Sequence, residues 1–245
     1  MTQSQPSSRT RMWAVFLIVI VILIIVWLLI TRGGTSAIEV STTPTAAPAT
    51  ILSPAPSPID SANLNILFSD NFDHSAGDWE LSPANQAQYV NGVMYLGDTE
   101  LEGAAWSRPH LRFQDFVLDV DSRWLGGSVG GTYGLRFRLD DADEYLAFYL
   151  HNDGWYNVIH NQRNQSTVLH EALSQAVNHA GEANHIHIEA QGERFRFFVN
   201  GTYLVDVQVA APESGDIMFV AEKVEGTDEF RVGFDNLVIG LHPPP

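Results

Sequence analysis

From residue 64 onward, apolar and polar residues alternate with the two-residue period of a β-strand. Such a strand places one face against a core and the other in solvent. The alternating apolar positions are Phe116, Leu118, Val120 and Trp124, Leu135 and Phe137, Leu146, Phe148 and Leu150, Ile186 and Ile188, and Phe195 and Phe197. Asn91-Gly92, Asp153-Gly154 and Asn200-Gly201 favour tight hairpin turns between the runs. The pattern predicts an antiparallel all-β sandwich or barrel over residues 64–241, with a short helix or long loop at 170–183.

The N-terminal region follows a different pattern. Residues 12–30 are an uncharged apolar run that, at about 1.5 Å per residue, can cross a bilayer core of roughly 30 Å. Arg9 and Arg11 precede this run, whereas Arg32 alone follows it. We therefore predict a single-pass transmembrane helix that has the lipid bilayer as its partner. The short segment 1–11 would be cytoplasmic and the large domain extracytoplasmic.

A cleaved signal peptide is the alternative, because Thr35-Ser36-Ala37 resembles a cleavage site. The apolar run, however, is longer than the core of about 7–15 residues that a signal peptide usually has. Ser, Thr, Pro and Ala dominate residues 31–63, which predicts a disordered linker. With so short a cytoplasmic segment, any signal would have to pass through a membrane protein partner.

Composition narrows the functional classes. The chain has 245 residues, no cysteine and a formal net charge of −16. The lack of cysteine excludes a disulfide framework, thiol nucleophiles and thiolate metal sites. An acidic surface repels phosphate backbones, so no nucleic acid partner is expected.

Several motifs of the domain together resemble one known superfamily. They are Asn184–Gly192, Phe198-Val199-Asn200-Gly201, Phe234–Val238, Phe68–Phe72, Gly77-Asp78-Trp79 and Phe116–Val120. In this order they look like the concanavalin A-like lectin/glucanase superfamily, and most resemble its domains related to 3-keto-disaccharide hydrolases and to laminin-G-type modules. The resemblance implies a two-sheet antiparallel jelly-roll sandwich whose last strand lies beside the first. It also implies a concave sheet across which relatives bind glycans.

Catalytic carboxylates are the first candidate chemistry. Glycosidases of this superfamily carry Glu-x-Asp-x-x-Glu on one strand, and the chain lacks that motif. Asp119 and Asp121 come nearest to the pair of carboxyl groups, about 5 Å apart, that retaining enzymes need. Arg123, Arg136 and Arg138 are expected on neighbouring strands of the same face, so cross-strand ion pairs explain the two carboxylates better. We assign no catalytic residue.

Ligand binding is the second candidate. Tyrosines are expected on the same outward face as these charged residues, where rings can stack on sugar C–H groups while charged groups bind hydroxyls. The predicted ligand-binding set is Asp119, Asp121, Arg123, Arg136, Arg138, Tyr145, Tyr149 and Tyr156. The alternative is that the tyrosines only cover half-buried sheet surface.

Two metal sites are also conceivable. Asp70, Asp73 and Asp235 would meet where the first and last strands pair, and their oxygens suit a structural calcium ion. Turn capping by Asp explains the same residues. His185 and His187 have a spacing found in zinc sites, but solvent-facing histidines are the simpler explanation, since no third ligand is identifiable.

The sequence thus predicts a membrane-anchored extracytoplasmic module that binds carbohydrate on its concave sheet face. Two alternatives stay open. One is an enzyme that hydrolyses a glycoside or 3-keto-disaccharide, against which the missing carboxylate motif counts. The other is a protein-binding adhesion or sensor ectodomain, which a large exposed apolar patch would indicate.

Overall fold

A computed structural model describes residues 55–73, 79–82, 87–98, 104–126, 130–140, 143–163, 165–222 and 230–242. All described residues belong to one compact unit within Ser53–Pro245. The predicted cytoplasmic segment, transmembrane helix and most of the linker lie outside the described residues. Within the described part, no helix has both the length and the apolar character needed to cross a bilayer.

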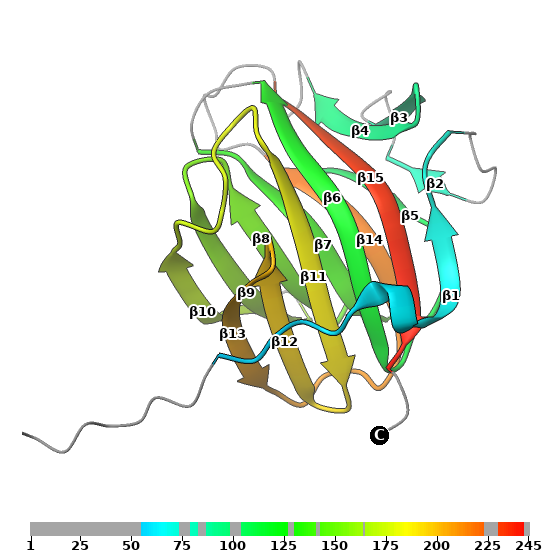
Figure 1. Cartoon of the computed structure of the whole chain (residues 1–245), viewed down its shortest axis with the longest axis vertical. Helices are drawn as coiled ribbons and strands as arrows, with labels where there is room; N and C mark the ends of the chain where they lie inside the picture. The colour runs from blue at the N-terminus through cyan, green and yellow to red at the C-terminus, as the bar shows by residue number, and fades with distance from the viewer. Residues whose placement is uncertain are drawn as a thin grey trace, which may run out of the picture. The chain divides into compact units, whose positions relative to one another are not determined.

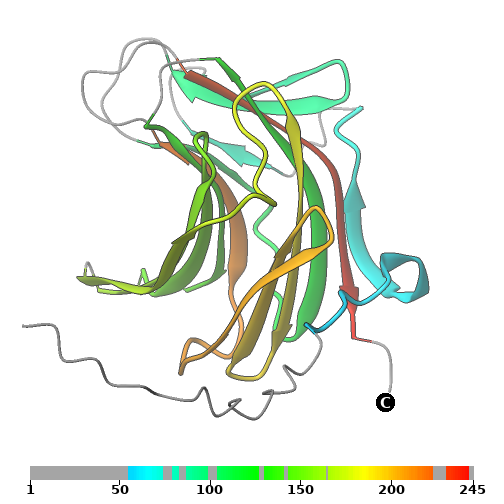
Figure 2. The same cartoon turned by 60° about the vertical axis from the view of Figure 1, so that its left-hand side comes forward.

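Two antiparallel sheets form a sandwich, as predicted (Figure 1). Sheet A runs in the order β13 (Thr202–Gln208), β12 (Arg194–Val199), β11 (Ala183–Gln191), β6 (Phe116–Gly126), β15 (Phe230–Leu241), β4 (Val93–Asp98) and β3 (Ala87–Val90), with β1 (Asn65–Asp70) also paired to β15. Sheet B runs in the order β10 (Gln165–Leu173), β9 (Trp155–Gln162), β8 (Tyr145–His151), β7 (Thr132–Leu139), β14 (Asp216–Glu222), β5 (Ala104–Arg108) and β2 (Glu80–Leu81). In Figure 2 the strands of sheet B bow toward sheet A, so the outer face of sheet B lies inside the curve.

Aromatic and branched side chains fill the space between the sheets. All the apolar positions that the alternation assigned to the core are buried. Phe219 of sheet B stacks on Phe234 of sheet A with ring centroids 4.5 Å apart, and Phe148 stacks on Phe197 at 4.8 Å. Stacked rings of this kind bury large apolar areas and contribute much of the stability of a core.

The predicted turns are present. Asn91 and Gly92 have φ angles of 52° and 77° between β3 and β4, and Asn200 and Gly201 have 51° and 75° between β12 and β13. Residues 170–183 contain no helix: β10 continues to Leu173, and a loop of turns leads from there to β11. The long-loop alternative is therefore correct for the second part of this segment.

The chain's ends meet on sheet A. β1 pairs with β15, with Asp70 opposite Leu237, so the first and last strands are neighbours as expected. Before β1, residues 55–63 lie across the outer face of sheet A, over β12, β11 and β6, and end in the 3₁₀ turn η1 (Ser61–Asn63) (Figure 1). The Ile59 N–H donates to Oε1 of Glu189 at 2.8 Å, and Ser61 Oγ donates to Oδ2 of Asp119 at 2.5 Å. The last part of the predicted linker thus contacts the sandwich.

Candidate functional site

The predicted ligand residues do not share one face, and this part of the prediction is wrong. β6 belongs to sheet A, whereas β7 and β8 belong to sheet B. The chain crosses from one sheet to the other after β6, so β6 is not a neighbour of β7 or β8. Asp119, Asp121 and Arg123 lie on the outer face of sheet A, and Arg136, Tyr145 and Tyr149 lie on the outer face of sheet B.

Arg138 and Tyr156 are not on an outer face at all. The Arg138 side chain is 2% exposed, donates from Nη1 to the carbonyl of Pro212 at 2.7 Å, and lies 5.5 Å from the Phe195 ring centroid. Tyr156 is buried in the core, where its hydroxyl lies 3.0 Å from Nε2 of His170. Both side chains lie inside the protein and therefore cannot contribute to a ligand site on an outer face.

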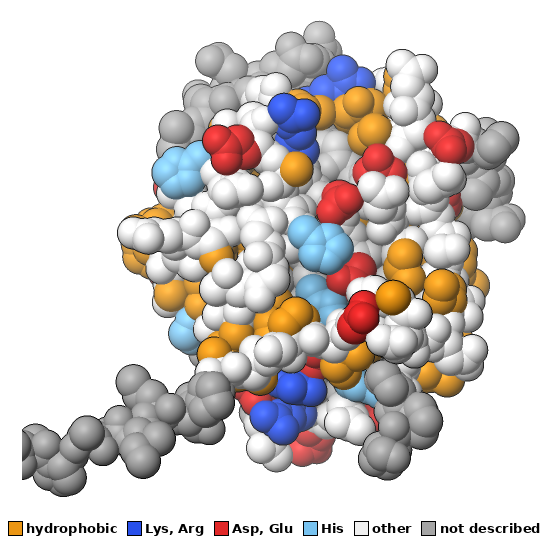
Figure 3. Space-filling view, in the orientation of Figure 1, with side chains coloured by type: hydrophobic (Ala, Val, Ile, Leu, Met, Phe, Trp, Pro, Cys, Tyr) orange, Lys and Arg blue, Asp and Glu red, His pale blue; other side chains and the backbone are white. Residues whose placement is uncertain are grey.

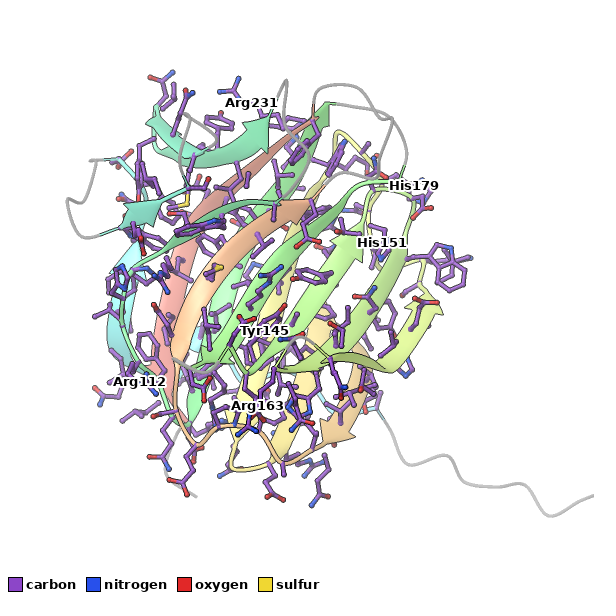
Figure 4. The ribbon with its side chains drawn as sticks, turned by 180° about the vertical axis from the view of Figure 1, so that it is seen from behind. Arg112, Tyr145, His151, Arg163, His179 and Arg231 are labelled. Carbon is purple, nitrogen blue, oxygen red and sulfur yellow. The ribbon has the colours of Figure 1, made fainter. Side chains whose placement is uncertain are left out.

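The outer face of sheet B, seen from the front in Figure 4 with Tyr145 and His151 labelled, has an apolar floor. The floor consists of Leu139, Tyr145, Ala147, Tyr149, Met218 and Val220, with Ala104, Trp106 and Ile159 packed against it. These residues come from β5, β14, β7, β8 and β9, so the floor extends across most of the sheet. These apolar residues face away from the core between the sheets, so core packing does not explain them. A ligand-binding surface is one explanation.

Arg136 is the central polar group of this face. Its Nε donates to the Tyr149 hydroxyl at 2.7 Å, and its Nη2 donates to Oε1 of Glu222 at 2.5 Å. Its guanidinium carbon also lies 4.8 Å from the centroid of the Tyr145 ring. The side chain is 22% exposed, so it is held in one orientation yet remains accessible. We name this cluster of Arg136, Tyr145, Tyr149 and Glu222 the Arg136 cluster.

Electrostatics within the Arg136 cluster keep it charged and paired. Burial by itself would lower the pKa of Arg136, but Tyr149, Tyr145 and Glu222 outweigh it and raise that pKa. Burial raises the pKa of the Tyr149 hydroxyl well above its usual range, although the neighbouring guanidinium works in the opposite direction. At neutral pH Arg136 is therefore charged, and the Tyr149 phenol that accepts from it is neutral.

Gly134 leaves a gap in the row of side chains beside Arg136. The row runs across the sheet from Trp106 through Val220 and Gly134 to Tyr149. A Cβ at Gly134 would lie 2.1 Å from the carbonyl oxygen of Phe148, so only glycine fits. The position between Val220 and Tyr149 therefore carries no side chain.

Asn157 extends the polar part of the face beyond Tyr149. It lies opposite Tyr149 on β9, and its Nδ2 is 3.1 Å from Nε2 of His151. Its Oδ1 is buried and has no hydrogen-bond partner within the described part of the chain. Burial lowers the pKa of His151, so this imidazole is neutral at pH 7. A buried amide oxygen without a partner is costly unless something else donates to it.

Four residues of this face were not predicted to bind a ligand: Trp106, Asn157, His151 and Glu222. Trp106 alternates with the buried Ala105 and Ser107, so the two-residue period was the available signal. Glu222 ends the run from Ile217 to Ala221, and its pairing with Arg136 depends on β14 lying beside β7. That neighbour relation joins residues far apart in the chain, and no local pattern predicts it.

On sheet A, acids and histidines form a connected network. The expected ion pairs of Asp119 and Asp121 with arginines are not formed, because both carboxylates bond to histidines instead. Oδ1 of Asp119 lies 2.9 Å from Nε2 of His185 and 2.8 Å from Nδ1 of His187, and Oδ1 of Asp121 lies 2.8 Å from Nδ1 of His185. The other ring nitrogen of His187, Nε2, lies 3.2 Å from Oε1 of Glu189 and extends the network to this residue. Figure 3 shows histidine and acidic side chains together at the middle of this face.

The hydrogen bonds of this network favour charged histidines. The bond to Asp119 is the largest cause that raises the pKa of His185 to about 9; burial opposes it, and the bond to Asp121 adds to it. Burial would raise the pKa of Asp119, but hydrogen bonds from the two histidines hold it well below its usual range. Burial likewise opposes the shifts of His187, whose pKa is raised, and of Glu189, whose pKa is lowered. Both ring nitrogens of each histidine face carboxylates, which leaves neither free for a zinc ion.

The predicted calcium site is not formed. Asp70 accepts from the Phe72 N–H at 2.8 Å and from Nε1 of Trp79 at 2.9 Å, so it caps a turn and fixes an indole. Asp73 is bonded to Nδ2 of Asn71 at 2.7 Å. Among the described residues, no group of three or more His, Asp or Glu has an arrangement that could hold a metal ion.

Comparison with solved structures finds the same two-sheet fold in several other proteins. A carbohydrate-binding module from Bacillus subtilis is similar with a TM-score of 0.54 and 17% identity, over 66% of this chain and 95% of that one. A Bacillus licheniformis beta-glucanase has a TM-score of 0.59 and 13% identity, over 72% of this chain and 98% of that one. A beta-1,3-1,4-glucanase from a mouse hindgut metagenome has a TM-score of 0.60 and 12% identity, over 71% of this chain and 99% of that one. At such identities the likeness shows the fold.

The sequence itself is more specific. No curated protein matches the chain. Residues 67–239, nearly the whole sandwich, match the 3-keto-alpha-glucoside-1,2-lyase-like domain. The chain therefore belongs to this family.

Proposed function

We propose that the outer face of sheet B binds a neutral carbohydrate at the Arg136 cluster. The observation that carries the proposal is the guanidinium of Arg136, fixed between Tyr149 and Glu222 beside the Tyr145 ring on an otherwise apolar floor. Apolar surface with a few oriented polar groups is the usual composition of a small-ligand site. Structural neighbours described as a carbohydrate-binding module and as glucanases support a sugar as the ligand.

Each group has a role in this proposal. Arg136 donates from its remaining N–H groups and Glu222 accepts, so together they bind neighbouring hydroxyls of a sugar. Tyr145 and Trp106 offer ring surface to the C–H face of a pyranose. Because Glu222 balances the charge of Arg136, a neutral sugar is preferred over an acidic one.

Binding is favoured over catalysis by the central strands. The outward positions of β7 and β8 are Thr132, Gly134 and Arg136, and Tyr145, Ala147, Tyr149 and His151. These positions carry no carboxylate, and Glu222 on the neighbouring β14 is a single carboxylate already paired with Arg136, whereas a glycosidase uses two. Turnover of the bound sugar is the second candidate, favoured by the lyase-like family of the sandwich.

The test is retention of the full-length chain, in detergent, on immobilised maltohexaose and laminarihexaose. Arg136→Gln should weaken retention at least tenfold, and Arg194→Gln, an arginine on sheet A paired with Asp206, should leave it unchanged. Failure of the wild-type chain to bind either hexaose, or equal binding by Arg136→Gln, would refute the proposal. Chromatography of the eluate for shortened or eliminated sugar would reveal the enzymatic alternative.

We also propose that residues 12–30 hold this domain at the outer surface of the membrane, since the run is uncharged and follows two arginines. Carbonate extraction of membranes tests retention, and protease added outside intact cells tests the side. Release of the chain by carbonate would indicate a cleaved leader instead.

A further inference from the structure

The outer face of sheet A carries a cleft of about 400 Å³, on the opposite side of the sandwich from the Arg136 cluster. Its lining combines apolar, acidic and basic side chains from β4, β6, β11 and β15, among them Tyr95, Asp121, Arg123, Leu125, Gly233 and Asp235. The volume falls within the roughly 300–1,000 Å³ typical of small-ligand sites. Two of the residues predicted from the sequence to bind a ligand, Asp121 and Arg123, lie here and not beside Arg136.

The apolar half of this cleft consists of three side chains around a glycine, Gly233. A Cβ at Gly233 would meet Cγ1 of Val93 at 3.0 Å, Cε1 of Tyr95 at 3.4 Å and Cδ1 of Leu125 at 3.5 Å. These three side chains therefore surround a position where the strand has none. Leu125 is 41% exposed, and the guanidinium of Arg231 lies 4.1 Å from the Tyr95 ring centroid and fixes that ring.

The polar half is held in place by its own hydrogen bonds. Asp121 accepts from Nδ1 of His185 at 2.8 Å and from Nδ2 of Asn236 at 3.0 Å. Arg123 donates from Nε to the carbonyl of Gly181 at 2.7 Å, which orients its guanidinium. Burial raises the pKa of Asp235, and the nearby charges of Asp121 and Asp73 add to this effect. The Asn236 N–H, which donates to Oδ1 of Asp235 at 2.7 Å, opposes the shift and fixes the carboxylate. Polar groups fixed before binding lose little entropy on binding.

We propose that this cleft is a second carbohydrate site, separate from the Arg136 cluster, which binds one hydroxylated ring of a neutral sugar. The C–H face of the ring would lie against Val93, Tyr95 and Leu125. Its hydroxyls would donate to Asp121 and Asp235 and accept from Arg123. The positive charges of Arg123 and His185 balance the two carboxylates, which favours a neutral ligand here as well. One chain would then bind sugars on both of its faces.

Carbene footprinting of the full-length chain tests this site residue by residue, with maltohexaose and laminarihexaose as probes. Labelling of Tyr95 and Leu125 should fall at least twofold with saturating hexaose, relative to Leu173, which is 62% exposed on β10 and serves as the internal reference. The fall should persist in Arg136→Gln. It should disappear in Arg123→Gln/Asp235→Asn and in Gly233→Ala, which fills the floor without a change of charge. Arg194→Gln is the matched control.

The outcomes separate the two proposals. Protection of Tyr145 and Trp106 without protection of Tyr95 and Leu125 would overturn the second site and leave the Arg136 cluster standing. Protection of the cleft alone would do the opposite. Protection of neither face by either hexaose would overturn both, and protection of the cleft that survives all three of its substitutions would overturn the assignment of these residues.

Discussion

Arg136 and Tyr149 are joined across β7 and β8 by a hydrogen bond of 2.7 Å from the guanidinium Nε to the phenol oxygen. The bond is diagonal, because Arg136 lies directly opposite Ala147 and Tyr149 directly opposite Gly134. Since Gly134 has no side chain, nothing stands between the arginine and the phenol. The orientation of the central polar group of sheet B thus depends on one hydroxyl and one glycine.

Removal of that hydroxyl should weaken sugar binding without loss of the fold. Tyr149→Phe keeps the ring in the apolar floor but takes away one acceptor of Arg136, which should lower the free energy of unfolding by about 1–2 kcal/mol. Affinity for maltohexaose should fall about tenfold, since 1.4 kcal/mol corresponds to a factor of ten. Titration calorimetry and urea unfolding measure the two effects. Tyr203→Phe on sheet A is the control, and equal affinities of the two variants would contradict the role of Tyr149.

The glycine in the row should tolerate no substitution. In Gly134→Ala, the new Cβ would lie 2.1 Å from the backbone oxygen of Phe148, and the strands would have to separate. We expect a loss of about 1–3 kcal/mol or more in the free energy of unfolding, the range for overpacked sites. Gly126→Ala is the matched control, because no atom lies within 4 Å of a Cβ at that position. Equal unfolding midpoints for the two alanine variants would show that the strand spacing is not fixed here.

The network on sheet A should make stability depend on pH in two windows. The pKa of His185 is raised from 6.5 to about 9, so its contribution is complete below pH 6.5 and is lost as pH rises through about 9. The pKa values of Asp119 and Glu189 are lowered from 3.8 and 4.5, so their contributions are present above those values and are lost as pH falls below them. Stability from the network is therefore greatest between about pH 5 and 6.5.

Urea unfolding across pH tests this with His185→Gln. The His185 side chain is 46% exposed, so solvent screening keeps its contribution to about 1 kcal/mol or less. The difference in unfolding free energy between wild type and variant should shrink between pH 6.5 and 9.5. A difference that stays constant over this range would show that the imidazole is not charged through Asp119 and Asp121.

The segment before β1 should stabilise the sandwich through one backbone N–H. Ile59→Pro removes the backbone N–H that donates to Oε1 of Glu189 at 2.8 Å. Glu189 is only 1% exposed. We expect a loss of about 1–3 kcal/mol in unfolding free energy, the range for one hydrogen bond to a charged group, while His187 still bonds to the same oxygen at 3.2 Å. Limited proteolysis should also cut residues 55–63 faster. Ser57→Pro, at an exposed position of the same segment, should change neither.

Local patterns predicted the strands and turns well, because each depends on a few consecutive residues. The run from Phe116 to Trp124 and the Asn200-Gly201 turn are examples. The site was harder to predict, because it depends on which strands become neighbours. His185 meets Asp121 across 64 residues of chain, and Arg136 meets Glu222 across 86. The crossing between sheets after β6 separated Asp119 from Arg136, and no motif in the sequence marks that crossing.

The segment 55–63 also sets the route by which mechanical force would enter the domain. A pull on the chain before residue 55 would first load the bonds from Ile59 to Glu189 and from Ser61 to Asp119. It would reach the β1–β15 ladder only after these bonds had broken. Strain would therefore be taken up on sheet A, while the strands that hold Arg136 and Tyr149 keep their spacing. If the Arg136 cluster binds a sugar as proposed, the bound sugar would be held on strands that tension on the preceding chain does not load.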